Sequence, residues 1–298
     1  MRLQRVSKLA QERYPNLNNR QIEEALAAGF ITLATGKKLK RGDKLSGVAD
    51  LDTKKLDEYL SKLRTGKLVV GFRIIWEDVD IVVIDKPYGI ASHPISLFDN
   101  DTVTQWAFAK YPNLASEFAQ AQPTVVPHRL DIGTSGLLIV GKTRAAYELW
   151  RARFHRHEVK KTYLAWCWGN PKEPTFLNDL PIGHVAGDSR KMVVVTANTR
   201  FKPPLLEAHT RGQVVKLESD PEIFLASIEC QSGVMHQVRV HLAALGYPLV
   251  GDSLYDANFQ ARSLKPAFHE LKAVALSFEN WQLSLDAGEF RQRYERIR

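Results

Sequence analysis

The densest group of residues that could do chemistry lies in VVPHRLDIGTSGLLIVGKT, residues 125–143. Two apolar runs flank a polar turn that contains His128, Arg129, Asp131, Thr134 and Ser135. We expect Asp131 at a strand end, because Gly133 and Gly136 permit a sharp bend and a close approach of substrate to the backbone. Asp131 is therefore a candidate catalytic group. The alternative is an aspartate that only hydrogen-bonds its own turn.

Two further segments carry candidate groups. In KKTYLAWCWGN, residues 160–170, alternation puts Tyr163 on one strand face with Ala165 and Cys167, opposite Leu164, Trp166 and Trp168. Tyr163 is either an ordinary half-buried strand aromatic or a platform for stacking a nucleobase.

SGVMHQVRVHLAALGYPLVGDSLY, residues 232–255, has helical apolar spacing through Leu245. Ser232 is the candidate cap and Gly246 the stop. Arg239 would then lie in the early turns of this helix, where its fork of donors could meet a carboxylate or a phosphate. The alternative for Arg239 is an ordinary surface arginine.

Nine histidines invite a test for metal binding, and their spacing argues against it. His236 and His241 are five residues apart, which places them about 140° apart on a helix. The sequence has no HExxH, paired CxxC or carboxylate-rich calcium loop, so we predict no metal. It also has no GxxxxGK[ST] or GxGxxG motif, which argues against nucleotide hydrolysis and hydride transfer.

The elements that must position these groups fall into two predicted domains, residues 1–66 and 67–298. The first begins with apolar residues at helical spacing from Leu3 to Tyr14, and a second helix follows from Asn18 or Asn19 through Ala28. FITLATGKKLKRGDKL, residues 30–45, then predicts two short strands around a Thr-Gly turn. A leucine pattern over residues 48–64 predicts a helix that bridges to the second domain.

The second domain mixes strands and helices. LVVGFRIIWE, DIVVID and TVVPHRL are rich in β-branched residues, whereas AAYELWRARF has a helical pattern. This irregular order predicts an α+β fold.

Composition limits the class of protein. A chain of 298 residues with 44% hydrophobic and 25% charged residues is too apolar for disorder along its whole length. The absence of a long apolar run and the two isolated cysteines favour a cytoplasmic protein without a disulfide framework. The net charge is +8, and 15 basic against 8 acidic residues give the first 67 residues +7 of it (15 − 8). We therefore expect a polyanionic partner such as nucleic acid.

Four motifs together resemble the RluA-like branch of RNA pseudouridine synthases. HRLDIGTSG, residues 128–136, is similar to the HRLD-x-x-TSG signature, and DKPYGIASHP, residues 85–94, to the KP-x-G segment before it. KTYLAWCWG, residues 161–169, resembles the K-x-Y-x-A strand, and residues 232–255 resemble the TG-x-x-HQ-I-R-V-H-L stretch that ends in GD-x-x-Y. The motifs occur in family order over residues 68 to about 280.

The N-terminal segment resembles a different module. Residues 2 to about 45 are similar to the S-four-like RNA-binding module, in which two helices and a hairpin present basic residues to folded RNA. Ala34, Thr35 and Gly36 stand where family members usually carry Val-Asn-Gly. This resemblance implies RNA contacts from Arg2, Arg5, Arg20, Lys37, Lys38, Lys40 and Arg41. A solvated basic helical hairpin is the alternative.

The resemblances imply a largely antiparallel mixed sheet flanked by helices, and a monomer that isomerises uridine in structured RNA without a cofactor. Asp131 matches the essential aspartate, Tyr163 the active-site tyrosine, and Arg239 the arginine that pairs with the aspartate. Substrate contacts are implied for His128, Arg129, Thr134, Ser135, Lys161, His236 and Gln237. Ribosomal RNA of the large subunit is the expected substrate, with transfer RNA as the alternative.

Some residues depart from the family pattern. Val234 and Met235 stand where many relatives have Arg and a small residue, and Lys272 stands where a His often follows a Leu. These departures concern the identity of the substrate, not the catalytic groups. Two rivals stay open: a noncatalytic RNA-binding or ribosome-assembly factor, and a glycosidase or nucleosidase. A glycosidase would need a second acid, for which Asp85 and Asp252 are available, although both also fit as turn residues.

Overall fold

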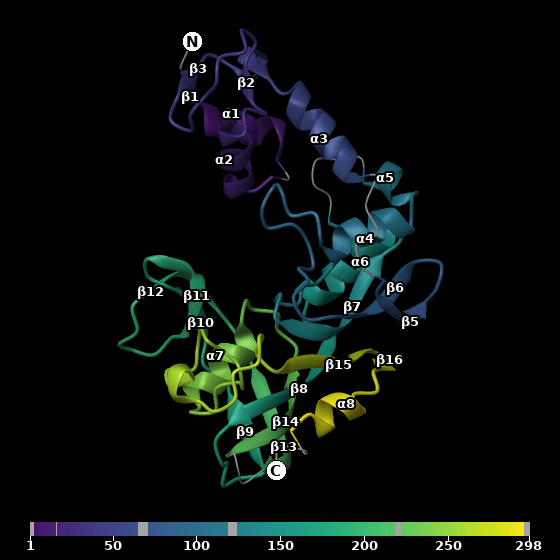
Figure 1. Cartoon of the computed structure of the whole chain (residues 1–298), viewed down its shortest axis with the longest axis vertical. Helices are drawn as coiled ribbons and strands as arrows, with labels where there is room; N and C mark the ends of the chain where they lie inside the picture. Colours follow the sequence, from purple (N-terminus) through teal and green to yellow (C-terminus); the bar gives the residue numbers. More distant parts are fainter. Residues whose placement is uncertain (1–2, 16, 65–70, 119–123, 219–221, 295–298) are drawn as a thin grey trace.

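The computed structural model describes residues 3–15, 17–64, 71–118, 124–218 and 222–294 (Figure 1). An N-terminal module, residues 3–64, sits at one end of a larger sheet region, residues 71–294 (Figure 1). The predicted boundary at residue 66 lies outside the described residues. The α+β class predicted from the sequence is confirmed. Within the described ranges, no helix combines the length and apolar character that crossing a membrane requires.

The N-terminal module has its own apolar core, in which Val6, Ile22 and Leu56 are fully buried or nearly so. Asn18 caps the second helix: its side chain accepts a hydrogen bond from the Gln21 amide, and the Gln21 side chain accepts one from the Asn18 amide. The elements are β1 (Gln4–Arg5), α1 (Val6–Arg13), α2 (Asn19–Ala27), β2 (Thr32–Leu33), β3 (Lys44–Leu45), the 3₁₀ turn η1 (Val48–Asp50), β4 (Leu51–Asp52) and α3 (Lys54–Arg64).

Three predictions for the module were wrong in detail. The first helix starts at Val6 rather than Leu3, because Gln4–Arg5 pairs as a strand with Lys44–Leu45. The predicted hairpin is reduced to an isolated bridge between Thr32 and Lys38, since β3 pairs with β1 and β2 pairs with β4. The bridging helix begins at Lys54, because Leu51 lies in β4 and residues 48–50 form η1.

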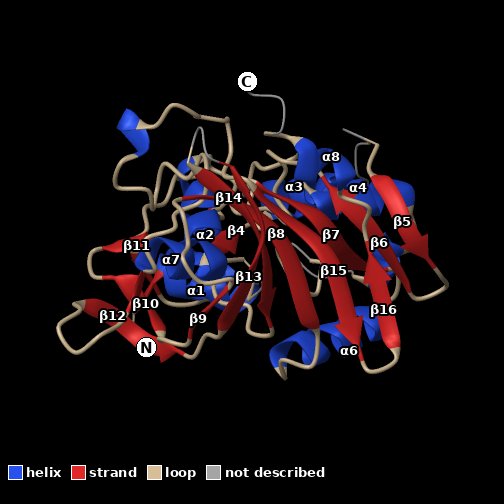
Figure 2. Ribbon diagram, turned by 90° about the horizontal axis from the view of Figure 1, so that it is seen from below, coloured by secondary structure: helices blue, strands red, loops and turns tan. Residues whose placement is uncertain are grey.

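One long sheet organises the rest of the described chain (Figure 2). Its order is β5-β6-β7-β15-β8-β14-β13-β9, with β16 paired to β15, and only the β7–β15 pair is parallel. The strands are β5 (Arg73–Glu77), β6 (Ile81–Lys86), β7 (Thr134–Gly141), β8 (Lys160–Trp168), β9 (Thr175–Asn178), β13 (Thr210–Glu218), β14 (Ile223–Cys230), β15 (Leu271–Phe278) and β16 (Trp281–Ser284).

Helices cover both faces of this sheet. The alternation predicted for β8 is confirmed, since Tyr163, Ala165 and Cys167 join one core cluster and Leu164, Trp166 and Trp168 join another. The first face carries α4 (Val103–Lys110), α5 (Leu114–Glu117) and α7 (Gln237–Ala244), and the second carries α6 (Arg144–His155) and α8 (Gly288–Gln292). The remaining short helix is η2 (Phe259–Ala261).

A separate three-stranded sheet projects from the side of the molecule near α7 (Figure 1). It consists of β10 (Ile182–Val185), β11 (Asp188–Val194) and β12 (Phe201–Leu206), in the order β11-β10-β12. Its inner residues Ile182 and Met192 pack with Val240 of α7 in a small buried cluster. The projecting sheet is therefore fixed to the helix that carries Arg239.

Two predicted elements next to the site were wrong. TVVPHRL, residues 124–130, forms no strand. The helix predicted from Ser232 begins instead at Gln237, because His236 has a left-handed backbone with φ of 57°. The Ser232 hydroxyl donates to the Gln237 side chain and so helps to hold the turn that precedes the helix.

Candidate active site

Asp131 lies in a tight turn immediately before β7. The Thr134 amide donates to the Asp131 carbonyl at 3.0 Å, which closes the turn. Gly136 has φ of +109°, and any side chain there would collide with the backbone of Ala273 in β15. A side chain at Gly133 would press on the His269 ring, whose atoms would lie as close as 2.8 Å. Both glycines therefore let the Asp131 turn pack directly against the end of the sheet.

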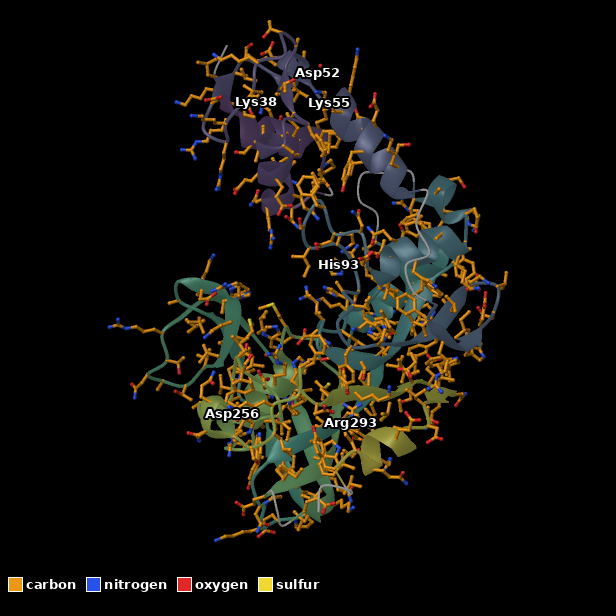
Figure 3. The ribbon with its side chains drawn as sticks, viewed as in Figure 1. Lys38, Asp52, Lys55, His93, Asp256 and Arg293 are labelled. Atoms are coloured by element: carbon orange, nitrogen blue, oxygen red, sulfur yellow. The ribbon has the colours of Figure 1, made fainter. Side chains whose placement is uncertain are left out.

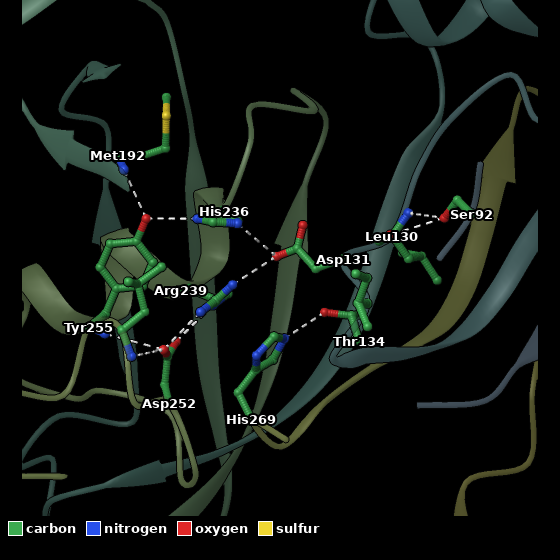
Figure 4. Close-up of polar contacts among 12 residues, drawn as sticks. Ser92, Leu130, Asp131, Thr134, Met192, His236, Arg239, Asp252, Tyr255 and His269 are labelled. Carbon is green, nitrogen blue, oxygen red and sulfur yellow. Dashed lines mark hydrogen bonds and ion pairs between the residues drawn. The ribbon is translucent and has the colours of Figure 1, made fainter. Parts of the chain in front are cut away.

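The Asp131 carboxylate faces a guanidinium that a second aspartate fixes (Figure 4). Arg239 Nη1 lies 3.3 Å from Asp131 Oδ2. The same guanidinium makes two shorter bonds to Asp252, Nε to Oδ2 at 2.8 Å and Nη2 to Oδ1 at 2.9 Å. This bidentate geometry locks the orientation of Arg239 and leaves one edge of its fork for Asp131.

Burial and pairing act in opposite directions on the buried pair. Burial alone would lower the pKa of Arg239, but hydrogen bonds and charge attraction from Asp252 outweigh it and raise that pKa. Burial alone would raise the pKa of Asp252, but the hydrogen bonds from Arg239 outweigh it and lower that pKa. Both groups therefore stay charged at neutral pH.

The histidines around Asp131 are neutral at pH 7. Burial lowers the pKa of His269 to about 4 and that of His128 to about 3. Burial also lowers the pKa of His236, although Asp131 lies 3.8 Å from its Nε2 and acts in the opposite direction. The permanent positive charge closest to Asp131 among these groups is therefore that of Arg239.

His236 links Asp131 to the projecting sheet (Figure 4). Its Nδ1 lies 2.8 Å from the Tyr255 hydroxyl, which also accepts a hydrogen bond from the Met192 amide of β11 at 2.9 Å. Tyr255 follows Asp252 by three residues, and its own amide donates to Asp252. One short segment thus positions both His236 and Arg239.

A buried lysine, Lys86, hydrogen-bonds to the backbone of the Asp131 turn. The Lys86 ammonium is fully buried and donates to the carbonyls of Pro87 at 3.0 Å, Ile90 at 2.8 Å and Ile132 at 3.5 Å. The Gly89 amide also donates to the Ile132 carbonyl. Burial lowers the pKa of Lys86 to about 7, while Asp131 and Asp85 act to raise it.

A cavity of about 670 Å³ opens over these groups, and we call it the main cavity. Asp131 and Arg239 line one side, Tyr163 lies on the sheet, and Leu205 and Leu206 come from the end of β12. Tyr163 is only 8% exposed, and burial raises its pKa well above the usual value, so the phenol is protonated. The cavity thus combines a carboxylate, a guanidinium and an aromatic ring, the three group types that the sequence proposed.

The other residues proposed for substrate contact fall into two groups. Those that line the main cavity are His128, Arg129, Thr134, Lys161, His236 and Gln237. Ser135 is buried in β7 and is absent from the cavity lining, so its hydroxyl is not placed to meet a ligand there.

Several of these lining residues are already engaged. His128 Nε2 accepts from the Ile139 amide, and Thr134 Oγ1 lies 2.8 Å from His269 Nε2. Lys161 Nζ donates to the carbonyls of residues 231 and 232. The Gln237 amide group donates to His209 O and Thr210 Oγ1. These side chains shape the cavity walls, and Arg129 differs from them because it is exposed.

The basic residues proposed for RNA contact lie on the N-terminal module. Arg5, Lys37, Lys38 and Lys40 are exposed, and no ion pair involves them within the part of the chain that the structure describes. Arg20 pairs with Glu24 at 2.8 Å and Arg41 with Glu23 at 2.6 Å. Arg2 lies outside the described residues.

Three residues that build the site were not among the site residues implied by the family resemblance: Lys86, Asp252 and Tyr255. Asp252 was explained as a turn residue, and it does accept from the Leu254 and Tyr255 amides, but it also fixes Arg239. Asp85 is not a turn residue, since it lies in β6 and pairs with Arg73 and Lys272. The sequence signal for Asp252 was an acidic residue close in the chain to Arg239, which was proposed to be functional. Spacing in the sequence alone does not show that the two side chains pair.

The fold is that of known structures. The human RNA pseudouridylate synthase domain containing 1 aligns with a TM-score of 0.58 at 22% identity, covering 72% of this chain and 82% of that one. The human RNA pseudouridylate synthase domain containing 4 aligns with a TM-score of 0.56, also at 22% identity, covering 79% and 92%. At this identity the likeness concerns the fold alone.

Sequence comparison identifies the family. The dual-specificity RNA pseudouridine synthase RluA of Escherichia coli K12 is 35% identical over 196 residues, 65% of this chain and 80% of that protein. An uncharacterized RNA pseudouridine synthase of Synechocystis is 32% identical over 182 residues, 61% of this chain but only 54% of the relative, so the match spans about half of that protein. The sequence model of RNA pseudouridylate synthase matches residues 80–244. On this evidence the chain belongs to the RNA pseudouridylate synthase family.

Proposed function

We propose that this protein isomerises specific uridines to pseudouridine in structured RNA. The observation that carries the proposal is the placement of Asp131 on the wall of the main cavity, with Arg239 at 3.3 Å and the Tyr163 ring lining the same space. The large subunit's ribosomal RNA is our first candidate substrate, and transfer RNA is the alternative. The E. coli relative is described as dual-specificity, so its name favours neither class.

The isomerisation requires few chemical groups beyond Asp131, Arg239 and Tyr163. The bond between the ribose and N1 of uracil breaks, the base turns, and a bond forms between the same ribose carbon and a ring carbon. A charged Asp131 can attack the anomeric carbon or take a sugar proton, and both routes need a carboxylate whose orientation is fixed. Arg239 supplies that orientation because Asp252 holds its guanidinium from the other side.

Tyr163 is suited to hold the uracil base rather than to transfer a proton. Since burial keeps its phenol protonated, the ring is suited to stack on a detached uracil. A role in removing the ring-carbon proton would require the phenol to pass its own proton on. We therefore assign stacking to Tyr163 as its main role.

The target nucleotide must leave its stack to reach Asp131, at a cost of a few kcal/mol that contacts in the cavity repay. Arg129 is exposed at the rim of the main cavity, where its guanidinium can meet a phosphate or stack in place of the extruded base. The N-terminal module, as an S-four-like domain of residues 1–66, would add phosphate contacts through its exposed lysines. Residues 67–298 would form the catalytic domain.

The glycosidase alternative loses support from the same geometry. Asp252 is held by the Arg239 fork, and Asp85 pairs with Arg73 and Lys272 at 2.9 Å each. Neither carboxyl is free to serve as the protonated second acid that a glycosidase needs.

Mapping of pseudouridine tests the proposal directly. Total RNA from cells that lack the gene should lose modification at defined uridines, and wild-type protein should restore it. The Asp131→Asn variant should fail to restore it, with a rate loss on the order of a thousandfold or more. If no position depends on the gene, the enzyme proposal is wrong. If Asp131→Asn restores modification, Asp131 is not the catalytic group.

A further inference from the structure

A second cavity of about 350 Å³ is also lined by Asp131. It shares five wall residues with the main cavity, namely Arg129, Leu130, Asp131, His236 and Arg239. Its remaining walls come from the loop after β6, from Ile132 and Gly133 of the Asp131 turn, from residues 251–253, and from residues 267–269. The candidate catalytic carboxylate therefore borders two adjoining cavities.

The second cavity carries side chains that have no polar partner among the described residues. Arg129 and His93 both line it, and neither side chain has a hydrogen bond or ion pair to the described residues. Burial and the charge of Arg129 lower the pKa of His93, so its ring is neutral and can both donate and accept. Figure 3 shows His93 on the loop between the N-terminal module and the sheet region.

An aromatic ring, that of Phe268, also lines the second cavity. Phe268 is 37% exposed, stacks at 6.2 Å on Tyr88, and touches Gly89, where a side chain would meet the ring at 3.2 Å. The ring is thus held by these neighbours while part of its surface faces the cavity. A held aromatic ring, a free guanidinium and a neutral imidazole match the base and the phosphate of a nucleotide.

The N-terminal module fixes the wall that carries His93. Leu97, four residues further along the loop, is fully buried in the module's core. The Glu24 carboxylate of α2 accepts from the Ser96 hydroxyl at 2.8 Å and from the Leu97 amide at 2.7 Å. The Tyr59 hydroxyl donates to the Leu97 carbonyl. The cavity therefore lies on the path between Asp131 and the basic module.

We propose that the second cavity is a subsite for the nucleotide directly adjacent to the target uridine in the RNA strand. Its base packs on Phe268, and the phosphate that joins it to the target meets Arg129 at the shared wall. This subsite rests on the proposed function, because the target ribose must lie at Asp131. It gives the enzyme a means to select uridines by their neighbour.

The test uses a hairpin RNA that contains a uridine identified by the mapping experiment. The base is removed from the 5′ neighbour in one version and from the 3′ neighbour in another, and kcat/KM and Kd are measured for the full-length protein. Removal at one of the two positions should cost the wild type about tenfold, the scale of one base–aromatic stack. The same removal should cost Phe268→Ala less than twofold, because that variant has already lost the stack.

Phe268→Tyr should restore the wild-type sensitivity, which a merely structural loss would not do. If Phe268→Ala does not fold, Arg129→Gln takes its place, with a neutral methylphosphonate at the linkage instead of the missing base. Equal sensitivity of wild type and variant at both neighbours would overturn the subsite, even if the wild type converts the intact hairpin. If mapping finds no target, the enzyme proposal fails. The subsite is then tested by binding alone, by comparing the Kd of five-residue oligouridylate with the Kd of the same oligonucleotide lacking one internal base.

Discussion

The surroundings of Asp131 and the exposed turn of the N-terminal module both carry positive charge, but they use it differently. Arg239 is held by two bonds to a fully buried Asp252, and only one edge of its fork is left for Asp131. Lys37 and Lys38 are exposed, with no ion pair among the described residues. The charge of Arg239 serves to fix the orientation of side chains, whereas the charges of Lys37 and Lys38 stay available to bind a polyanion. Activity at the Asp131 site should therefore depend on the exact positions of its side chains, and RNA binding by the module should depend on salt concentration.

The largest effect is expected from removing the charge of Asp252, which holds Arg239. Asp252→Asn keeps an oxygen for the Leu254 and Tyr255 amides but loses the charge that holds the guanidinium. We expect kcat to fall about a hundredfold, since small misplacements in an active site cost that much. Unfolding free energy should drop by about 3–5 kcal/mol, because a buried charge loses its partner. Single-turnover assays and urea denaturation measure the two effects.

Asp256→Asn is the matched control for that experiment. Asp256 is also buried and accepts from Arg262 Nε at 2.9 Å, but neither residue lines a cavity that Asp131 lines. This variant should lose stability while keeping kcat within a few fold. Equal losses of kcat in the two variants would mean that stability, not the orientation of Arg239, explains the effect.

Lys86 is a third kind of cation, because burial opposes its charge. Burial lowers its pKa to about 7 in the folded protein, whereas an unfolded lysine titrates near 10.4. Between these values the unfolded state binds one more proton, so the contribution of Lys86 to stability rises with pH by up to about 1.4 kcal/mol per unit. Relative to Lys86→Met, the wild type should therefore gain about 2 kcal/mol from pH 7 to pH 9.

Urea denaturation at pH 7, 8 and 9 measures that difference. Lys86→Met also removes this donor from the Pro87 and Ile90 carbonyls, which lowers stability by about 1–3 kcal/mol at every pH, while the Ile132 carbonyl keeps the Gly89 amide. The exposed Lys55→Met on α3 serves as the control and should show no change of slope. A wild-type minus Met difference that stays flat with pH would show that Lys86 remains charged throughout.

The sequence predicted local features of the site well where one strand or turn decides them. The two faces of β8 followed from alternation alone, and the Gly133 and Gly136 turn placed Asp131 at the start of β7. Ser232 failed as a helix cap because its hydroxyl donates to Gln237 across a turn that the left-handed His236 creates. Periodicity does not register such a turn, since the side-chain pattern continues through it.

Features that depend on contacts between residues far apart in the chain could not be predicted from the sequence. β3 pairs with β1 across about forty residues, so the hairpin suggested by the Thr-Gly turn could not be excluded from local signals. The burial of Leu97 in the N-terminal module likewise joins segments that are far apart in the chain. Asp252 looked like a turn residue for the same reason: its partner on α7 is defined only by the packed structure.

The smallest expected effect concerns the exposed lysines of the module. We expect Lys37→Gln/Lys38→Gln to weaken RNA binding severalfold at low salt and to reduce the slope of log Kd against log salt by up to about 2, one unit for each lost phosphate contact. The effect should fall on KM rather than kcat, because Asp131 and Arg239 are untouched. Filter binding of the hairpin RNA from 50 to 300 mM salt measures it.

Charge substitution is a better test of the module than its deletion. Removing residues 1–66 would also expose Leu97 and release Ser96 from Glu24, and so would disturb the loop that carries His93. Lys54→Gln/Lys55→Gln removes the same charge from α3 of the module and is the matched control. If both double variants change the salt slope equally, the module acts through its overall charge. If neither does, these lysines make no phosphate contacts with the RNA.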